Sequence, residues 1–345
     1  MTTRRNFLKN TTMLAAGLGV SPLLSSSPLR SYQKEEVING KVRIAVIGVG
    51  MGCRDLQGAL TDNPWVHCVG MCDVNKVRLE EQLARFKKDF PEQTGSIKAY
   101  TDFREVLANK EIDGVIIATP DHWHPYIFAE ALKAGKAIYV EKPVGNSISE
   151  CNAMMDFQKK YKGVVTTGLW QTSQRYFRAA NEILKSGVLG DVYKVQLWLC
   201  QSTNPRPSVE DSEAPSTLDY DMWLGPAPER PFNNSRFRGW RGFWDYGGGQ
   251  QTDWGVHWID SAFDGLKALG LCDREYPDAV FSIAYKDPAS FNETPSCQTS
   301  IFQYKNFHIE WAQQVAYLYN RNQGVAWVGS KATLVCNREG YELIP

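Results

Sequence analysis

Asp253 and His257 stand four positions apart in the segment 244–260, a spacing that puts both side chains on one face of a helix. A carboxylate beside an imidazole orients the ring and tunes its basicity, which suits a general base that takes a proton from an alcohol. Asp260, three positions after His257, is a candidate second partner for the imidazole. The alternative is a helix capped by Thr252 or Asp253, with His257 packed in the core.

Lys142 is a second group that could do chemistry. It lies in Glu141-Lys142-Pro143, directly after the apolar run 137–140. A lysine held at the end of a strand next to a nicotinamide can donate to a substrate hydroxyl or stabilise a developing alkoxide. The alternative is a surface lysine that forms a salt bridge with Glu141. The position of Lys142 in the sequence does not distinguish the two interpretations.

His122 and His124 follow another apolar run and raise the question of a metal site. Together with Asp253 and His257 they offer enough ligands, but none of these residues shows the close spacing of known metal motifs. The eight cysteines are scattered without any Cys-x-x-Cys pair, so neither a zinc site nor a disulfide scaffold is indicated. We predict no metal.

A short apolar and β-branched run, 42–47, precedes a glycine-rich turn. Glycines after a buried strand let a pyrophosphate approach the amides at the next helix N-terminus. An acidic residue ends the next strand-like run about 20 residues on, as the dinucleotide fingerprint expects, and a carboxylate there favours NAD over NADP. The alternative is an ordinary strand–turn–helix with a surface aspartate. The cofactor-binding candidates from this pattern are Gly48, Gly50, Met51, Gly52 and Asp73.

The elements that would position these residues alternate between strand and helix as far as residue 168, which predicts a doubly wound parallel α/β sheet, a Rossmann domain, over 40–168. After that, strands follow one another without helices between them. This pattern predicts an α+β domain with an open, mostly antiparallel sheet over 169–345. Residues 201–235 carry six of the seventeen prolines, and we expect this long loop to form the rim or lid of a substrate cleft.

Aromatic residues gather in the second half of the chain. Six tryptophans lie within about sixty residues, mixed with Arg, Asp and Gly, and form either a binding surface or a buried core: Trp198, Trp223, Trp240, Trp244, Trp254 and Trp258. Lys and Arg number 38 among the 345 residues, and Asp and Glu also number 38. No net field therefore draws the protein to nucleic acid or to an anionic membrane.

The N-terminal sequence is typical of a targeting segment. Arg4-Arg5 is followed by Phe7-Leu8 and then by a modest apolar run, 13–24, which is too short and too rich in glycine for a stable membrane anchor. It resembles a twin-arginine signal, which exports proteins already folded and would make the protein periplasmic. Such export implies a tightly held cofactor. The alternative is a disordered basic tail, and residues 1–35 are excluded from fold reasoning either way.

The glycine turn, Asp73, the run Ala118-Thr119-Pro120-Asp121-His122-Trp123-His124 and Glu141-Lys142-Pro143 together resemble the Gfo/Idh/MocA oxidoreductases. The resemblance implies that Lys142 is catalytic and lies along the cofactor. It implies the same cofactor contact for four more residues: Thr119, Pro120, His124 and Glu141. The three glycines before Asp253-x-x-x-His257 look like the family's second signature, and Gln171 falls where a polar substrate contact is common.

The hypothesis that follows is an exported NAD-dependent oxidoreductase acting on a sugar, glycoside or cyclitol hydroxyl. His257, assisted by Asp253, would remove the hydroxyl proton, and Lys142 would stabilise the oxygen, the two domains bringing these groups together at the nicotinamide ring. Stacking of the sugar is expected from Trp123, Trp240 or Trp244. The alternatives are a glycosidase that uses transient oxidation by a retained NAD, and a non-catalytic sugar-binding protein. A homo-oligomer, dimer or tetramer, is expected through the second sheet.

Overall fold

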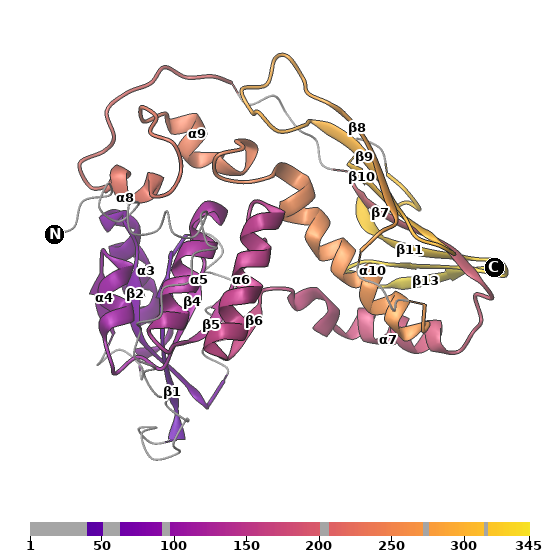
Figure 1. Ribbon diagram of the computed structural model, residues 1–345, viewed down its shortest axis with the longest axis horizontal. Helices are drawn as coiled ribbons and strands as arrows, with labels where there is room; N and C mark the ends of the chain where they lie inside the picture. The colour runs from indigo at the N-terminus through magenta and orange to yellow at the C-terminus, as the bar shows by residue number, and fades with distance from the viewer. Residues whose placement is uncertain (1–39, 51–62, 92–96, 201–206, 272–275, 314–316) are drawn as a thin grey trace, which may run out of the picture. The chain divides into compact units, whose positions relative to one another are not determined.

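The computed structural model describes residues 40–50, 63–91, 97–200, 207–271, 276–313 and 317–345. The chain divides into two compact units, and Figure 1 follows their elements along the chain. The first unit runs to Gly168 and includes Asp211–Asn233; the second comprises Leu169–Glu210 and Asn234–Pro345. The sequence predicts a single second domain over 169–345, whereas in the structure residues 211–233 belong to the first unit.

In the described part of the first unit, six parallel strands follow the order β3-β2-β1-β4-β5-β6, which is the predicted doubly wound arrangement. Side chains alternate between the two faces of this sheet, so Ala45 and Ile47 enter one core and Ile44 and Val46 the other. Helices α4, α5 and α6 cover the first of these faces, and α3 covers the second. The strands are β1 (Val42–Ile47), β2 (Val66–Cys72), β3 (Lys98–Tyr100), β4 (Gly114–Ile117), β5 (Ala137–Val140) and β6 (Val165–Thr167), and the helices are α3 (Lys76–Asp89), α4 (Phe103–Ala108), α5 (His124–Lys133) and α6 (Ile148–Tyr161).

Residues 211–233, including helix α8 (Tyr220–Leu224), pack on the first unit because their backbone finds partners just after β2. The Lys76 amide donates to the Thr217 carbonyl at 2.9 Å, and the Asp219 amide donates to the Val74 carbonyl at 3.0 Å. These bonds join positions more than a hundred residues apart. We call residues 211–233 the returning segment.

In the described part of the second unit, seven strands form a mixed sheet of order β13-β12-β11-β7-β10-β9-β8. Only the pair β7–β10 is parallel among these strands, so the prediction of an open, mostly antiparallel sheet is confirmed. The strands are β7 (Val192–Leu199), β8 (Ala279–Tyr285), β9 (Cys297–Gln303), β10 (His308–Gln313), β11 (Gln323–Gly329), β12 (Thr333–Cys336) and β13 (Tyr341–Ile344).

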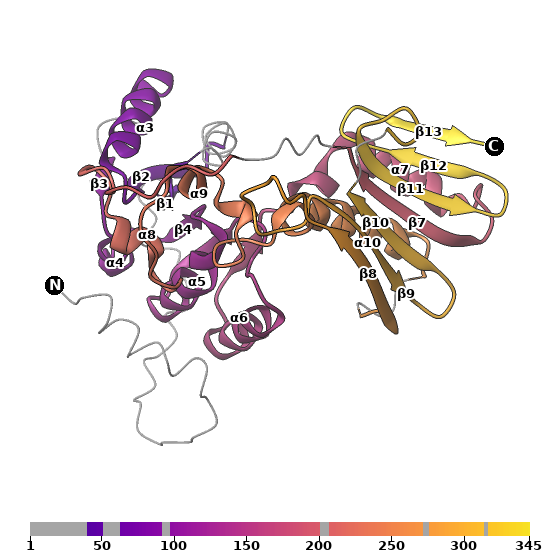
Figure 2. The same ribbon diagram turned by 90° about the horizontal axis from the view of Figure 1, so that it is seen from above.

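Helices α7 (Arg175–Lys185) and α10 (Val256–Ala268) pack on one face of this second sheet, as the views in Figures 1 and 2 show. Phe177, Ala180 and Leu184 recur at helical spacing along the buried face of α7, and Trp258, Ala262 and Leu266 do the same on α10. Their partners in the sheet include the fully buried rings of Trp311 and Trp327. This packing holds α10, which carries His257, against the sheet.

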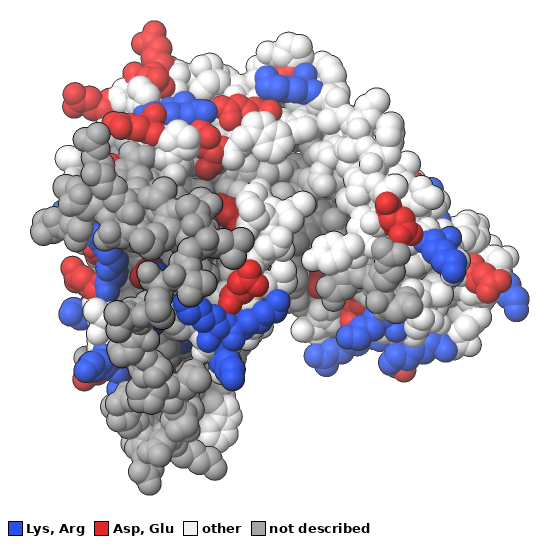
Figure 3. Space-filling view, viewed as in Figure 1, with Lys and Arg blue, Asp and Glu red and all other residues white. Residues whose placement is uncertain are grey.

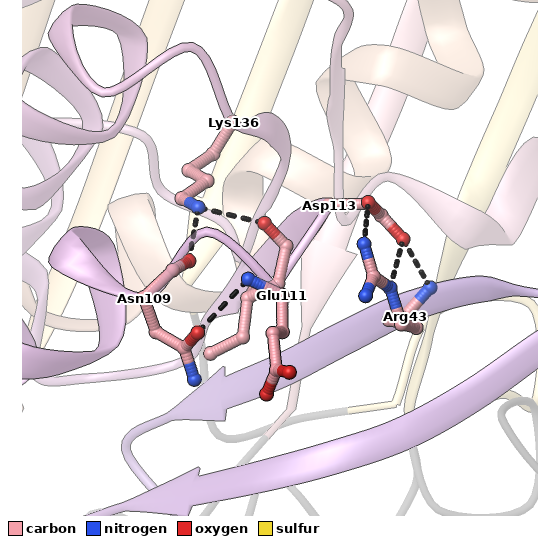
Figure 4. Close-up of polar contacts among 6 residues, drawn as sticks. Arg43, Asn109, Glu111, Asp113 and Lys136 are labelled. Atoms are coloured by element: carbon pink, nitrogen blue, oxygen red, sulfur yellow. Dashed lines mark hydrogen bonds and ion pairs between the residues drawn. The ribbon is translucent and has the colours of Figure 1, made fainter. Parts of the chain in front are cut away.

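The amino ends of the first sheet's strands are tied together by internal polar contacts (Figure 4). The guanidinium of Arg43 pairs with Asp113 through two bonds of 2.9 and 3.0 Å, and the Lys136 ammonium donates to the carbonyls of Asn109 and Ile112 at 2.6 and 2.7 Å. Burial lowers the pKa of Lys136, although the nearby Asp113 opposes this effect. These contacts join the amino ends of the strands. In open parallel sheets the ligand binds at the opposite edge, beyond the carboxyl ends of the strands.

Charged side chains of both signs occur on the face shown in Figure 3, in keeping with a formal net charge of zero. Among the described residues, no helix has the length and apolar character needed to cross a bilayer.

Candidate functional site

The turn after β1 accepts only glycine at its first position. Gly48 has a φ of +88°, and a Cβ there would lie 2.6 Å from the carbonyl oxygen of Ala118 and 2.7 Å from the amide of Thr119. Close approach of two strand ends therefore excludes any side chain. Gly50 is more open, with the Arg78 guanidinium 3.7 Å from its virtual Cβ. Met51 and Gly52, the remaining glycine-turn candidates, lie outside the described residues.

Asp73 ends β2 with its carboxylate fixed by two backbone amides. Its Oδ2 accepts from Val49 at 3.0 Å and its Oδ1 accepts from Asn75 at 2.8 Å. Burial raises the pKa of Asp73, while Arg78 and the two amides act in the opposite direction. Each oxygen of a carboxylate has a further acceptor position, so Asp73 can still accept hydrogen bonds from ribose hydroxyls.

Thr119 follows the end of β4, and His124 is the first residue of α5. The Nε2 atom of His124 is 2.9 Å from the Thr119 carbonyl oxygen, and its Nδ1 atom is 2.7 Å from the Pro143 carbonyl oxygen. A carbonyl only accepts, so both contacts are hydrogen bonds when both ring nitrogens carry protons. The Thr119 hydroxyl is buried and has no hydrogen-bond partner in the described part of the chain. Because buried polar groups normally have a partner, this hydroxyl is a candidate ligand contact. Pro120 directly precedes the 3₁₀ turn at Asp121–Trp123.

Trp123, a predicted sugar-stacking residue, is only 5 % exposed. Its indole nitrogen donates to the carbonyls of Met222 and Trp223 in the returning segment, both at 3.1 Å. The ring also lies so close to Gly225 that a Cβ there would overlap it. The stacking role predicted for Trp123 is therefore wrong, because the returning segment covers the ring. The neighbouring His122 points its Nε2 at the Trp223 carbonyl, 3.0 Å away.

Glu141 and Lys142 follow β5, and the Glu141 amide continues the sheet by donating to Ile117 at 2.8 Å. The Glu141 carboxylate accepts from the Tyr139 hydroxyl at 3.3 Å and from the Lys142 backbone amide at 3.2 Å. Burial raises the pKa of Tyr139, and the adjacent Glu141 charge adds to the effect, so the phenol stays a donor. The carboxylate is thus oriented, and Lys142 is half-buried beside it.

In the second unit, His257 is buried in the first turn of α10. Asp253 lies in the preceding π-helical turn, Gln251–Gly255, rather than in regular α-helix. Its carboxylate pairs with Arg241 at 3.0 Å, a residue that the sequence analysis did not single out. π-Helical turns are rare and recur at functional sites. Thr252 does not cap α10: its hydroxyl accepts from the Gly248 amide at 3.1 Å.

Gln171, the predicted substrate contact, has no exposed surface. Its amide nitrogen donates to the Ser261 hydroxyl at 2.8 Å and to the His257 carbonyl at 3.3 Å, and its oxygen accepts from Arg338 Nε at 2.9 Å. Because the side chain is buried and engaged at both ends, Gln171 is a structural link and not a substrate contact. Arg338 was missed because its partners are distant in sequence.

Two tryptophans, Trp170 and Trp254, contact this network. The Trp170 ring meets the His257 ring edge-on, with centroids 6.0 Å apart, and the Arg338 guanidinium lies 4.8 Å from the Trp170 centroid and 4.7 Å from that of Trp254. Of the other predicted stacking residues, Trp240 is half-buried under the Arg241 guanidinium and Trp244 is exposed. The aromatic cluster is therefore part core and part surface.

No group of three His, Cys, Asp or Glu side chains among the described residues is arranged to hold a metal ion. The first unit's residues do fit a dinucleotide. A glycine turn that a Cβ would fill, a fixed carboxylate at Asp73 and an unsatisfied hydroxyl at Thr119 all lie at strand carboxyl ends.

The fold and these residues define a two-unit protein with an NAD-binding Rossmann unit and a second unit built on a mixed sheet. The chain belongs to the Gfo/Idh/MocA oxidoreductase family, so the resemblance seen in the sequence is confirmed. The description "Oxidoreductase family, NAD-binding Rossmann fold" matches residues 42–169, and "Oxidoreductase family, C-terminal alpha/beta domain" matches residues 178–267.

Among its curated relatives, an alpha-N-acetylgalactosaminidase of Tannerella forsythia is 32% identical over 163 residues, which is 43% of this chain and 34% of the relative. A myo-inositol 2-dehydrogenase of Thermotoga maritima is 25% identical over 181 residues, or 52% of this chain and 48% of the relative. The chain therefore spans about a third to a half of the curated relatives it matches.

Solved structures share the fold. The WlbA dehydrogenase of Bordetella pertussis, in complex with NADH and UDP-GlcNAcA, superposes with a TM-score of 0.64 at 18% identity, covering 86% of this chain and 79% of that one. A levoglucosan dehydrogenase in complex with NADH and L-sorbose gives 0.63 at 17% identity, covering 88% and 75%.

Proposed function

We propose that the protein is an NAD-dependent oxidoreductase that acts on a hydroxyl group of a sugar, glycoside or cyclitol. The observation that carries the proposal is the buried imidazole of His257, one turn after the ion-paired Asp253, in a chain whose other unit fits a dinucleotide. Relatives named as a myo-inositol dehydrogenase and a levoglucosan dehydrogenase support this substrate class.

In the proposed mechanism His257 takes the proton of the substrate hydroxyl. The Asp253 carboxylate, which is paired with Arg241, stabilises the imidazolium that forms. Lys142 donates to the substrate oxygen as negative charge develops on it. NAD, which the glycine turn at Gly48 and the Asp73 carboxylate would hold, would accept a hydride from the hydroxyl carbon, which would become a carbonyl carbon.

The test combines Lys142→Met and His257→Gln with a screen of sugars and glycosides at the NADH absorbance band. Each variant should lose at least about a hundredfold in turnover, while the affinity for NAD, measured by calorimetry, stays within a factor of a few. Lys133→Met changes a surface lysine paired with Glu130 and serves as the control. Normal turnover in both variants would end the assignment.

A second candidate function is a glycosidase that oxidises its substrate transiently with a retained NAD, which is regenerated in each cycle. It is favoured by the relatives named as an alpha-N-acetylgalactosaminidase and as glycosyl hydrolase family 109 proteins. Product analysis separates the two. A keto sugar with NADH identifies the dehydrogenase, and a hydrolysed glycoside without net NADH identifies the glycosidase.

We also propose export through a twin-arginine signal, on the basis of Arg4-Arg5 and the apolar run that follows. Residues 1–39 lie outside the described residues. Fusing residues 1–35 to a folded reporter should deliver it to the periplasm, and changing both arginines to lysine should stop delivery. Equal delivery by both fusions would contradict the proposal.

Self-association through the second sheet is a further part of the proposal. Strand β8 lies at an edge of this sheet and exposes Phe281, Ile283 and Tyr285. An exposed edge strand with large apolar side chains is a template for a partner. Light scattering should show a dimer or tetramer for the wild type and a smaller species for Ile283→Lys; a monomeric wild type would refute it.

A further inference from the structure

Trp170 keeps 44 % of its surface exposed, although indole is the largest apolar side chain. It lies in the 3₁₀ turn at Trp170–Ser173, at the start of the second unit. Its ring meets the ring of His257 at 68°, with the centroids 6.0 Å apart. Leaving so much apolar surface in water costs free energy, and this surface is next to the proposed general base.

The orientation of this ring is set by one guanidinium. Arg338 lies over both Trp170 and Trp254, 4.8 and 4.7 Å from their centroids, and its Nε donates to Gln171 at 2.9 Å. Gln171 in turn binds Ser261, one turn beyond His257 on α10. Arg338 thereby ties the indole to the helix that carries the imidazole. A ring held in this way loses little conformational entropy when a ligand covers it.

Arg338 and the edge contact with His257 take up part of the Trp170 ring, and the exposed area is what these contacts leave. An apolar face beside a proton acceptor matches the two sides of a sugar ring or a cyclitol. Such a ring has a face of C–H groups, which packs on an aromatic surface, and an edge of hydroxyl groups, which meets the imidazole.

We propose that Trp170 is the surface on which the carbohydrate ring stacks, with Arg338 as the positioning residue that holds it. The assignment rests on the proposed function and adds the residue that binds the substrate ring. It replaces the predicted stacking residue Trp123, which is buried within the first unit. The proposal does not extend to the exposed Trp244. The Trp244 amide donates to Glu293, and the Trp244 ring has no aromatic contact with His257 among the described residues.

The test uses the full-length protein loaded with NAD and four probes: myo-inositol, levoglucosan, L-sorbose and p-nitrophenyl α-N-acetylgalactosaminide. Saturation-transfer NMR measures binding and shows which ring protons touch the protein. Trp170→Ala should weaken binding of the recognised probe about tenfold, from the loss of roughly half an indole face, and should erase saturation of its C–H face. Trp170→Phe should retain most of both, and NAD affinity should not change.

Trp65→Ala, which removes an exposed indole ahead of β2 in the first unit, is the matched control and should bind like the wild type. The assignment is overturned if Trp170→Ala binds normally, if Trp244→Ala causes the loss instead, or if Trp170→Ala weakens NAD rather than the probe. A wild type that binds none of the four probes at millimolar concentration would overturn it as well.

The role of Arg338 is tested by a double-mutant cycle. Arg338→Met should raise KM for the probe and leave kcat nearly unchanged, since it loosens the ring and does not touch the reacting atoms. In the Trp170→Ala background the same change should add almost nothing, because the group that Arg338 positions is already gone. Additive losses would show that Arg338 acts on the ligand directly and would overturn its positioning role.

Two experimental outcomes distinguish a failure of the stacking role of Trp170 from a failure of the proposed oxidoreductase activity. Normal probe binding by Trp170→Ala, with His257→Gln inactive, removes the stacking surface and keeps the oxidoreductase. Probe binding that depends on Trp170 but never reduces NAD keeps the stacking surface and removes the oxidoreductase.

Discussion

The Nδ1 atom of His124 lies 2.7 Å from the carbonyl oxygen of Pro143, and its Nε2 atom lies 2.9 Å from that of Thr119. One buried side chain thus joins the end of β4 to the turn after β5, where Lys142 stands. These two contacts position the Glu141-Lys142-Pro143 turn relative to the end of β4.

Replacing His124 by alanine should remove the contacts that its ring makes with the Thr119 and Pro143 carbonyl groups. The expected loss is about 2 kcal/mol of unfolding free energy, together with weaker NAD binding and a lower kcat, because the turn that carries Lys142 loses its anchor. His308→Ala, at a half-buried histidine in the second unit, is the control and should retain NAD affinity. Equal NAD affinity in both variants would show that the anchor is dispensable.

Gly48→Ala should abolish NAD binding. The added Cβ would lie 2.6 Å from the Ala118 carbonyl oxygen, a backbone atom that cannot rotate away, so β1 and β4 must separate at the cofactor end. Gly135 has a similar φ of +70° but no atom within 4 Å of its virtual Cβ. Gly135→Ala should therefore cost about 1 kcal/mol from backbone conformation alone and should keep NAD binding by calorimetry. Equal effects of the two changes would show that crowding at Gly48 does not matter.

Gly225→Ala should release the returning segment, because the new Cβ overlaps the Trp123 ring. Hydrogen exchange is expected to quicken at residues 217–225 and at the turn after β2, to which they bond, while the second sheet stays protected. The control is Gly270→Ala, at a glycine of φ +69° with open space around it. Unchanged exchange at 217–225 would mean that Trp123 and Gly225 do not hold the segment.

Asp260→Asn should stabilise the protein above pH 6. Burial raises the pKa of Asp260 from 3.8 to about 6, and the Asp264 charge adds to the effect. The folded state then binds a proton more tightly than the unfolded state, so wild-type stability falls as pH rises from about 4 to 6 and is constant above that range. Since Asp260 is partly exposed, we expect a gain of about 1 kcal/mol at pH 8.

Urea unfolding at pH 4 and pH 8 measures this difference, which should nearly vanish at pH 4. Asp156→Asn, at an exposed position of α6 that pairs with Lys159, is the control for removing a carboxylate. A gain that is equal at both pH values would exclude titration of Asp260 as its source.

The Rossmann unit could be predicted from the sequence because its signals are local. The apolar run of β1, the glycine at Gly48 and the acid at Asp73 are each dictated by burial or by backbone sterics over a few residues. The open, mostly antiparallel character of the second sheet was also predicted, because its strands follow one another along the chain. Periodicity shows such elements whenever one face is buried.

No local sequence pattern predicts the packing of the returning segment or the network around His257. The bond from Arg338 to Gln171 spans 167 positions, and those from Trp123 to the returning segment span about 100. Residue type suggested that Trp123 stacks on the substrate, and the family resemblance suggested that Gln171 contacts it, but neither signal reveals burial by a distant segment.

The sequence by itself determined the two sheets, the glycine turn, the acidic residue at the end of β2 and the residue types available for proton transfer, because these depend on short-range sterics and apolar periodicity. Only the tertiary structure decided that Trp123 and Gln171 are buried and that Arg338 holds Trp170 beside His257. Those outcomes follow from contacts between segments that are far apart in the chain and are brought together by folding.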